Sequence, residues 1–121
     1  MDPQTLSSIK SILLKYPELN DKHIFIYGSR ATGKNRKYSD IDLGIEGNQP
    51  LSATTYVSLQ QDFVDSDIPF TIDVVDFNKT SDTFKSIAKS QIIPIHLNDQ
   101  NWIPNFPPYV HQLLNLVSKF Q

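Results

Sequence analysis

The segment between residues 23 and 46 constrains the fold most, because it joins two strand-like stretches through a turn and a basic loop. Residues 23–27 (HIFIY) are an apolar, β-rich run that predicts a buried strand. Residues 38–46 (YSDIDLGIE) alternate between apolar and polar or small side chains, which predicts a second strand with one face in the core. Gly28 and Ser29 interrupt the chain just after the first run. Any fold of this chain must therefore place a turn and a basic loop between two strands.

The rest of the chain alternates between helical and strand-like patterns. Helices are expected over residues 2–16, 52–65, from 81 or 82 onward and about 108–120, strands over residues 70–76 and 92–97, and a loop with or without a short helix over residues 30–37. The third of these helices is expected to turn Phe84, Ile87 and Ala88 inward, and Pro94 confines the last strand to an edge or an irregular start. This order predicts a single α/β or α+β domain over residues 1–121, with a small mixed β-sheet flanked by helices.

Composition excludes several kinds of site. With 121 residues the chain has little room for a second domain. A net charge of −2 gives no overall sign of nucleic-acid binding, and no aromatic stacking row is present, so direct binding of nucleic acid is not expected. The absence of cysteine excludes disulfides, zinc–thiolate sites and cysteine nucleophiles. Since there is no long apolar run and no signal-like start, a soluble cytoplasmic protein without membrane contact is expected.

Asp40 and Asp42 are expected to face the same side of the second strand. Residues two apart on a strand point the same way, with Cα atoms roughly 7 Å apart. Two such carboxylates repel each other, and a divalent cation between them removes the repulsion through the hard oxygen ligands that Mg²⁺ prefers. Gly44 follows on the same face and is expected to leave space for a ligand. The alternative is a solvated strand face, although Asp is a poor strand former.

The Gly28–Ser29 turn is a candidate phosphate-binding element. Glycine permits close approach of the backbone, and the Ser29 hydroxyl and exposed N–H groups can hold phosphate oxygens. The loop that follows carries four basic residues that can hold a triphosphate or an acidic partner: Arg30, Lys34, Arg36 and Lys37. Taken singly, an ordinary turn and a solvated basic loop remain open interpretations.

Together, these residues resemble the signature of the nucleotidyltransferase superfamily related to DNA polymerase β. The motif Gly-Ser-Arg-Ala-Thr-Gly, followed by Ser-Asp-Ile-Asp-Leu, looks most like that of the minimal nucleotidyltransferases, or MNT proteins. The layout of most of the chain fits, and the diagnostic residues lie between Gly28 and Leu43. The chain has Thr32 where many members have arginine. The resemblance implies a polymerase β-like nucleotidyltransferase fold.

The resemblance also implies a third carboxylate on a later strand. The candidate is Asp73, and the rival is Asp76. Strand alternation places them on opposite faces, so at most one of them fits. Asp73 lies mid-strand among β-branched residues, whereas Asp76 lies at the strand end, where Asp is common as a turn residue. Asp73 is therefore the predicted third member, with Asp40 and Asp42, of a catalytic, metal-binding set.

By resemblance, these carboxylates bind two Mg²⁺ ions, and Gly28, Ser29 and Arg30 bind the triphosphate of ATP. MNT proteins commonly pair with HEPN proteins as toxin–antitoxin systems. The implied function is an antitoxin that transfers AMP from ATP to a tyrosine hydroxyl of a HEPN RNase toxin and so neutralises it, within a hetero-oligomer. Residues 102–109 and the last helix carry apolar and aromatic side chains that either complete the core or contact such a partner.

Two other functions remain open. One is a binding antitoxin that occludes its HEPN partner with weak or no catalysis. The other is a free-standing transferase for a small molecule such as an aminoglycoside. The short chain has no acceptor-binding domain, which argues against the small-molecule substrate.

Overall fold

The computed structural model describes residues 1–34 and 40–97. Its elements, in chain order, are α1 (Pro3–Leu13), η1 (Pro17–Leu19), β1 (His23–Tyr27), α2 (Ser29–Thr32), β2 (Ile41–Glu46), α3 (Ala53–Val64), β3 (Ile72–Asp76), η2 (Phe77–Lys79), α4 (Asp82–Ala88) and β4 (Ile93–Ile95). The expected helix near residues 108–120 and the segment 102–109 lie outside the described residues. None of the described helices is both long and apolar enough to cross a membrane.

The four strands form one mixed sheet in the order β3-β2-β1-β4. β1 pairs with β2 and with β4 in antiparallel fashion, whereas β2 and β3 are parallel. β4 is an edge strand, as Pro94 predicted, because proline cannot donate to a second neighbour. The expected small mixed sheet flanked by helices, an α+β fold, is confirmed.

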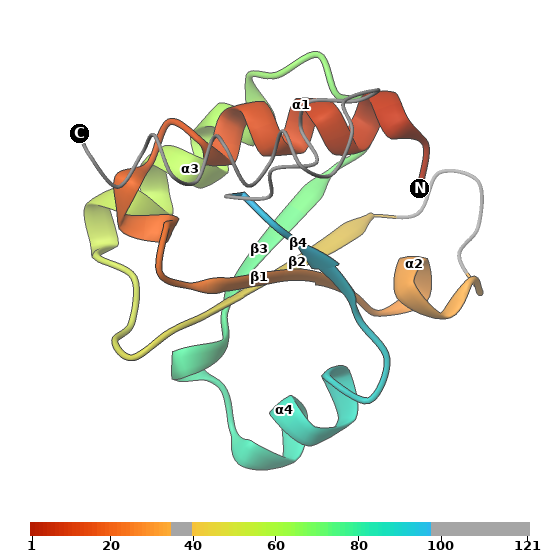
Figure 1. Cartoon of the computed structure of the whole chain (residues 1–121), viewed down its shortest axis with the longest axis vertical. Helices are drawn as coiled ribbons and strands as arrows, with labels where there is room; N and C mark the ends of the chain where they lie inside the picture. The colour runs from red at the N-terminus through yellow and green to blue at the C-terminus, as the bar shows by residue number, and fades with distance from the viewer. Residues whose placement is uncertain (35–39, 98–121) are drawn as a thin grey trace, which may run out of the picture.

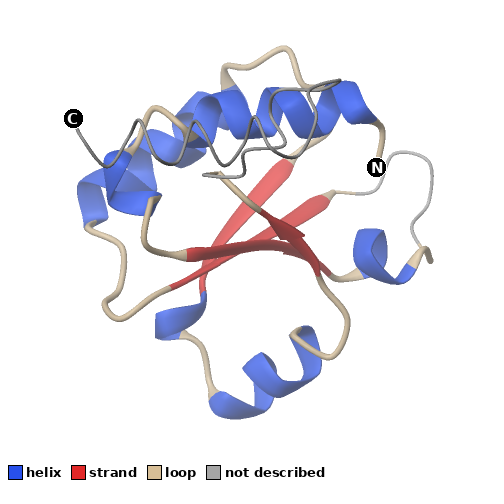
Figure 2. Ribbon diagram, in the orientation of Figure 1, coloured by secondary structure: helices blue, strands red, loops and turns tan. Residues whose placement is uncertain are grey.

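Helices α1 and α3 cover one face of the sheet, and α4 lies on the other (Figures 1 and 2). The main core fills the space under α1 and α3. Its largest fully buried side chains include Ile9 and Leu13 from α1 and Leu59 from α3. The alternating apolar residues of β2 expected to face the core, namely Ile41, Leu43 and Ile45, are all 0 % exposed.

Helix starts follow the capping chemistry of the sequence. The Asp2 carboxylate accepts the Thr5 N–H at 2.8 Å, and the Ser52 hydroxyl accepts the Thr55 N–H at 3.2 Å. Both are N-cap bonds that satisfy helix donors left without a partner in the first turn. α1 ends before the expected position at residue 16, because Pro17 disfavours a helical conformation in the residue before it.

Two expectations about the face under α4 are wrong. Ile87 is 71 % exposed and is not an inward core residue. Ala88 does pack against the cluster under α4, and the Phe84 ring, although 40 % exposed, contacts the rings of Tyr27 and Phe77. Space beside Gly44 is also filled, because a Cβ there would lie 2.4 Å from the Phe25 ring and 2.8 Å from the Phe77 ring. Aromatic rings from β1 and η2 already occupy this face, so it has no space for a ligand at Gly44 and leaves the Ile87 side chain outside.

Strand ends also differ from the sequence pattern. β2 begins at Ile41, so Asp40 stands just before it, and β3 begins at Ile72 instead of Phe70. The Ile41 N–H nevertheless donates to the Thr71 carbonyl at 2.9 Å, which joins the first residue of β2 to the residue just before β3. Asp40 is therefore fixed at the entry of the β2–β3 pair.

Candidate active site

One row of side chains crosses three strands at the same end of the sheet. Tyr27, the last residue of β1, pairs with Asp42 of β2, and Asp42 pairs with Asp73 of β3. Residues paired across neighbouring strands point to the same face. Asp42 is partly buried, whereas Asp73 and Asp40 are exposed. The structure thus brings the three sequence-predicted aspartates to one edge.

Gly28 closes this edge from the β1 side. It has φ 72° and ψ −150°, a conformation that residues with a Cβ rarely adopt. A Cβ on Gly28 would lie 2.4 Å from Asp42 Oδ2. The turn therefore passes directly against the Asp42 carboxylate. Its expected approach to phosphate oxygens stays a prediction.

Ser29 begins the short helix α2, which is tied to distant parts of the chain. Its carbonyl accepts the Lys34 N–H at 3.1 Å, which folds the chain after α2 back on its first residue. Gln91 donates a side-chain N–H to the Ala31 carbonyl at 3.1 Å. The Arg30 guanidinium carbon lies 4.4 Å above the centre of the Phe70 ring, in a cation–π contact. The predicted phosphate-binding turn is thus held from both sides.

The carboxylates influence one another electrostatically. Burial raises the pKa of Asp42 above its usual value, and the negative charges of Asp73 and Asp40 raise it further. Burial, followed by the charges of Asp42 and Asp73, raises the pKa of Tyr27 to about 12. The fold therefore holds a carboxylate where its negative charge is unfavourable, which is typical of functional sites.

Asp76 has a structural role instead. It is 8 % exposed, and its two oxygens accept the N–H groups of Leu51 at 2.9 Å and Asn78 at 3.0 Å. It lies three residues after Asp73 and on the opposite face of β3, as alternation predicted. These bonds hold the start of α3 and the η2 turn.

Sequence and structure comparisons identify the family. The family model described as "Polymerase beta, Nucleotidyltransferase" matches residues 7–101. This chain belongs to the polymerase β nucleotidyltransferase family. A relative from Haemophilus influenzae, named "Probable protein adenylyltransferase MntA", is 34 % identical over 92 residues, which cover 76 % of this chain and 79 % of the relative. The expected resemblance to the MNT branch is thereby confirmed.

Two solved structures have the same fold as this nucleotidyltransferase. One is a chain of a toxin–antitoxin complex with AMP-PNP, with a TM-score of 0.60 and 20 % identity, covering 96 % of this chain and 86 % of the other. Another comes from a complex of the tri-AMPylated Shewanella oneidensis HEPN toxin with an MNT antitoxin. Its TM-score is 0.58 at 18 % identity, and it covers 100 % of this chain and 90 % of the other.

The acidic edge of the nucleotidyltransferase suits a hard cation in its donor chemistry. All three candidate ligands supply carboxylate oxygens, which Mg²⁺ prefers. A cation would also offset the repulsion that raises the pKa of Asp42. In residues 1–34 and 40–97, however, no three acidic, histidine or cysteine side chains converge to hold a metal ion. Asp40 and Asp73 are exposed side chains, so small rotations about their own bonds can redirect their oxygens.

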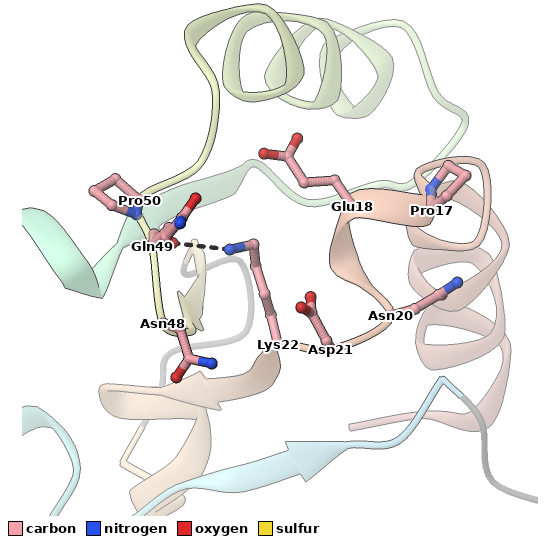
Figure 3. Close-up of a pocket in the computed structure, with 8 residues that line it drawn as sticks. All are labelled: Pro17, Glu18, Asn20, Asp21, Lys22, Asn48, Gln49 and Pro50. Atoms are coloured by element: carbon pink, nitrogen blue, oxygen red, sulfur yellow. Dashed lines mark hydrogen bonds between the residues drawn. The ribbon is translucent and has the colours of Figure 1, made fainter.

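A polar pocket of about 440 Å³ lies far from Asp40, Asp42 and Asp73 (Figure 3). It is at the other end of the β1–β2 pair, where His23 pairs with Glu46. Lys22 crosses it and donates to the Gln49 carbonyl at 2.8 Å (Figure 3). Its lining residues include neither a Gly-Ser turn nor an Asp-x-Asp pair, so it does not repeat the motif of the opposite end.

Tyr27 is the neighbour of the site that the sequence did not single out. It ends the strand before Gly28, and only the antiparallel pairing of β1 with β2 places it opposite Asp42. The succession of two strands joined by one loop is a signal for antiparallel pairing. The alternation within each strand alone does not reveal which residue of β1 lies opposite Asp42.

Proposed function

We propose that this chain is a magnesium-dependent antitoxin that transfers AMP from ATP to a tyrosine hydroxyl of a HEPN RNase toxin. The toxin and antitoxin form a hetero-oligomer in the cytoplasm, and modification of the tyrosine neutralises the RNase. The observation that carries the proposal is the register of Asp42 with Asp73, with Gly28 packed against Asp42. This arrangement supports phosphate binding by the Gly28 turn beside the three carboxylates.

Each residue has a defined role in this reaction. Backbone N–H groups of the Gly28 turn and the Ser29 hydroxyl hold the triphosphate, and Arg30 supplies positive charge beside them. Asp40, Asp42 and Asp73 would hold two Mg²⁺ ions, which neutralise the charge on the phosphates when bound. Most of the catalytic effect then comes from positioning and electrostatic stabilisation.

The chemical step is an in-line displacement at the α-phosphorus. The acceptor oxygen forms a bond to the α-phosphorus, the bond from that phosphorus to the bridging oxygen breaks, and pyrophosphate leaves. Asp73, on the exposed side of the row, takes the proton of the acceptor hydroxyl. The products are an AMP-modified tyrosine and pyrophosphate.

The choice of a protein acceptor rests on the relatives. The Haemophilus influenzae relative is named a probable protein adenylyltransferase, and one structural neighbour is a complex with an AMPylated HEPN toxin. Another neighbour is a toxin–antitoxin complex with an ATP analogue. These names support ATP as the nucleotide and a HEPN protein as the acceptor.

Co-expression with a HEPN protein, followed by mass spectrometry of that protein, tests the proposal. The wild-type chain should add AMP to a tyrosine. Asp42→Asn and Asp73→Asn should each lower transfer by at least about 100-fold while the fold survives. Asp67→Asn, an exposed aspartate in the loop before β3, is the matched control and should transfer normally.

The same experiment separates catalysis from occlusion. If Asp42→Asn still neutralises the toxin and the toxin mass is unchanged, the chain acts by binding alone. Near-normal transfer by either Asn variant would show that the carboxylate assignment is wrong. An absence of transfer by the wild-type chain would overturn the adenylylation proposal itself.

A further inference from the structure

Strand β3 is at one edge of the four-stranded sheet, next to β2 (Figure 1). On its inner side it pairs with β2, where Asp73 lies opposite Asp42. The outer side of an edge strand presents a row of backbone N–H and C=O groups without a strand to bond them. Among the four described strands, the one that carries Asp73 is thus supported by a neighbouring strand on one side only.

Gln60 of α3 bonds the outer side of β3 at this point. Its side-chain N–H donates to the Ile72 carbonyl at 2.7 Å, and its side-chain oxygen accepts the Val74 N–H at 3.1 Å. Both distances are those of ordinary hydrogen bonds. A side-chain amide carries a donor and an acceptor, as a backbone residue does, so Gln60 bonds β3 as one residue of a further strand would.

The two bonds of Gln60 are placed on either side of Asp73. The Ile72 carbonyl belongs to the peptide unit before Asp73, and the Val74 N–H belongs to the peptide unit after it. The orientation of these two peptide units sets the direction of the Cα–Cβ bond between them. Pairing with β2 on one side and the Gln60 amide on the other therefore fix the direction in which the Asp73 side chain leaves the strand.

Packing of α3 on the core holds Gln60 in place. Leu59, the preceding residue, and Phe63, one turn later, are both buried. The Ile72 and Val74 side chains belong to the same core, on the face of β3 away from Asp73. Gln60 is partly buried at the margin of this core, where water competes less for its two bonds than at an exposed position.

We propose that Gln60 is a positioning residue for the transfer of AMP and acts through Asp73. The inference rests on the proposed function, in which Asp73 takes the proton of the acceptor hydroxyl. The Asp73 side chain is exposed, so its placement depends mainly on the backbone that carries it. A displacement of about 1 Å at a reacting group can lower a rate by about 100-fold. Loss of the Gln60 bonds should therefore slow the chemical step although the carboxylate remains.

Gln60→Met tests the proposal, with Gln61→Met as its matched control. Methionine resembles glutamine in length and helix propensity, but it has no N–H to donate and only a weak acceptor. Gln61 is the next residue of α3, is exposed, and donates its amide to Asp65, the C-cap of the same helix, at 2.9 Å. Circular dichroism verifies that both variants fold. Gln60→Glu, which keeps an acceptor for the Val74 N–H but loses the donor, answers the same question if Gln60→Met does not fold.

Transfer of AMP from ATP to a HEPN protein is measured for each variant at saturating Mg²⁺. Gln60→Met should lower kcat by about tenfold or more. The KM for ATP should not change, because the Gly28 turn is untouched. Gln61→Met should match the wild type in both constants.

A double-mutant cycle with Asp73→Asn separates positioning from a general loss of stability. A residue that acts through the Asp73 carboxylate has no further effect once that carboxylate is gone, so Gln60→Met should not lower the residual rate of Asp73→Asn. An unchanged kcat in Gln60→Met, or the same fold loss with and without the Asp73 carboxylate, would overturn the positioning role and leave adenylylation intact.

Amide hydrogen exchange, followed by NMR without substrates, gives a readout that does not depend on transfer. The Val74 N–H should exchange faster in Gln60→Met than in the wild type, while the amides of β1 stay as protected as before. Exchange at Val74 that does not change, or that rises equally in β1, would contradict local support by Gln60. Near-normal transfer by Asp73→Asn, or none by the wild type, would instead overturn the proposed function and the role of Gln60 with it.

Discussion

Gly28 shows how one backbone position couples the turn to the chemistry. Any L-residue at φ 72° and ψ −150° is strained, which costs on the order of 1–2 kcal/mol. The Cβ of Gly28→Ala would also meet Asp42 Oδ2 at 2.4 Å. A carboxylate at the end of a side chain can swing away, so the larger effect falls on activity. We expect transfer to drop by about 100-fold, because a displacement near 1 Å suffices for such a loss.

Gly33→Ala is the natural control for Gly28→Ala. Gly33 has φ 75°, but no atom lies within 4 Å of the Cβ that alanine would add. It should lose about 1 kcal/mol of unfolding free energy in urea titrations, from the backbone alone, and keep its transfer rate. If both variants lost activity equally, the contact between Gly28 and Asp42 would not explain the effect.

Asp42 should lower the stability of the metal-free protein. Burial, and then the charges of Asp73 and Asp40, raise its pKa in the fold. The unfolded chain binds fewer protons at this carboxyl between its usual pKa and the raised one, so stability falls as pH rises through that window. Above this pH window Asp42 is ionised in the folded protein, and the full loss of stability is present. Asp42→Asn should therefore have a higher Tm than the wild type near neutral pH in the presence of a chelator.

Two further Tm comparisons of the wild type with Asp42→Asn test this destabilisation. As pH falls toward the usual Asp value of about 3.9, the advantage of Asp42→Asn should shrink. Adding Mg²⁺ should raise the Tm of the wild type more than that of the variant, since ligand binding stabilises only the state that binds it. A lower Tm for Asp42→Asn in chelator would contradict the electrostatic account.

At the scale of the element, the two aspartates of β3 point to opposite faces of the sheet and have different roles. Asp73 faces the site, whereas Asp76 is buried and accepts two backbone N–H groups. Asp76→Ala leaves both donors without their partner, and we expect the unfolding free energy to drop by about 2–3 kcal/mol. The folded fraction should still transfer AMP at a rate close to that of the wild type.

Asp73→Ala should have the converse effect, with lost transfer and no fall in Tm, since Asp73 is exposed and its charge repels Asp42. Denaturant titration and single-turnover transfer on the same preparations measure the two properties. A loss of transfer in fully folded Asp76→Ala would instead make Asp76 part of the reaction.

Local patterns predicted the elements that depend on them. Alternation alone placed the apolar residues of β2 in the core, and it separated Asp73 from Asp76 onto different faces. The helical pattern of α4 failed for Ile87, because a helical stripe does not reveal how far the cluster beneath the helix extends. Phe25, Tyr27 and Phe77 fill that face, so Ile87 remains outside. The pairing of Tyr27 with Asp42 depends on strand register, which is a property of the whole sheet. The catalytic and metal-binding roles of the aspartates stay predictions.

At the scale of the whole molecule, the two faces of the sheet differ in what they do. One is closed by α1 and α3 over the main core, and α4 lies on the other (Figure 1). Strand alternation turns Asp42 and Asp73 toward the α4 face. The Tyr16 hydroxyl, just after α1, donates to the Asp62 carboxylate of α3. This bond joins the two covering helices far from the reaction, so it offers a way to change stability without changing chemistry.

Burial, and then the hydrogen bond to Asp62 and its negative charge, raise the pKa of Tyr16 to about 12. The folded phenol therefore stays protonated after the unfolded one has ionised, and its contribution to stability is complete below pH about 10 and lost as pH rises toward about 12. Tyr16→Phe should cost about 1 kcal/mol near neutral pH, for one lost hydrogen bond. The difference between wild type and variant in urea unfolding should then close across that alkaline window, with the transfer rate unchanged. A difference that does not depend on pH would contradict this account, because the phenol ionises only in the wild type.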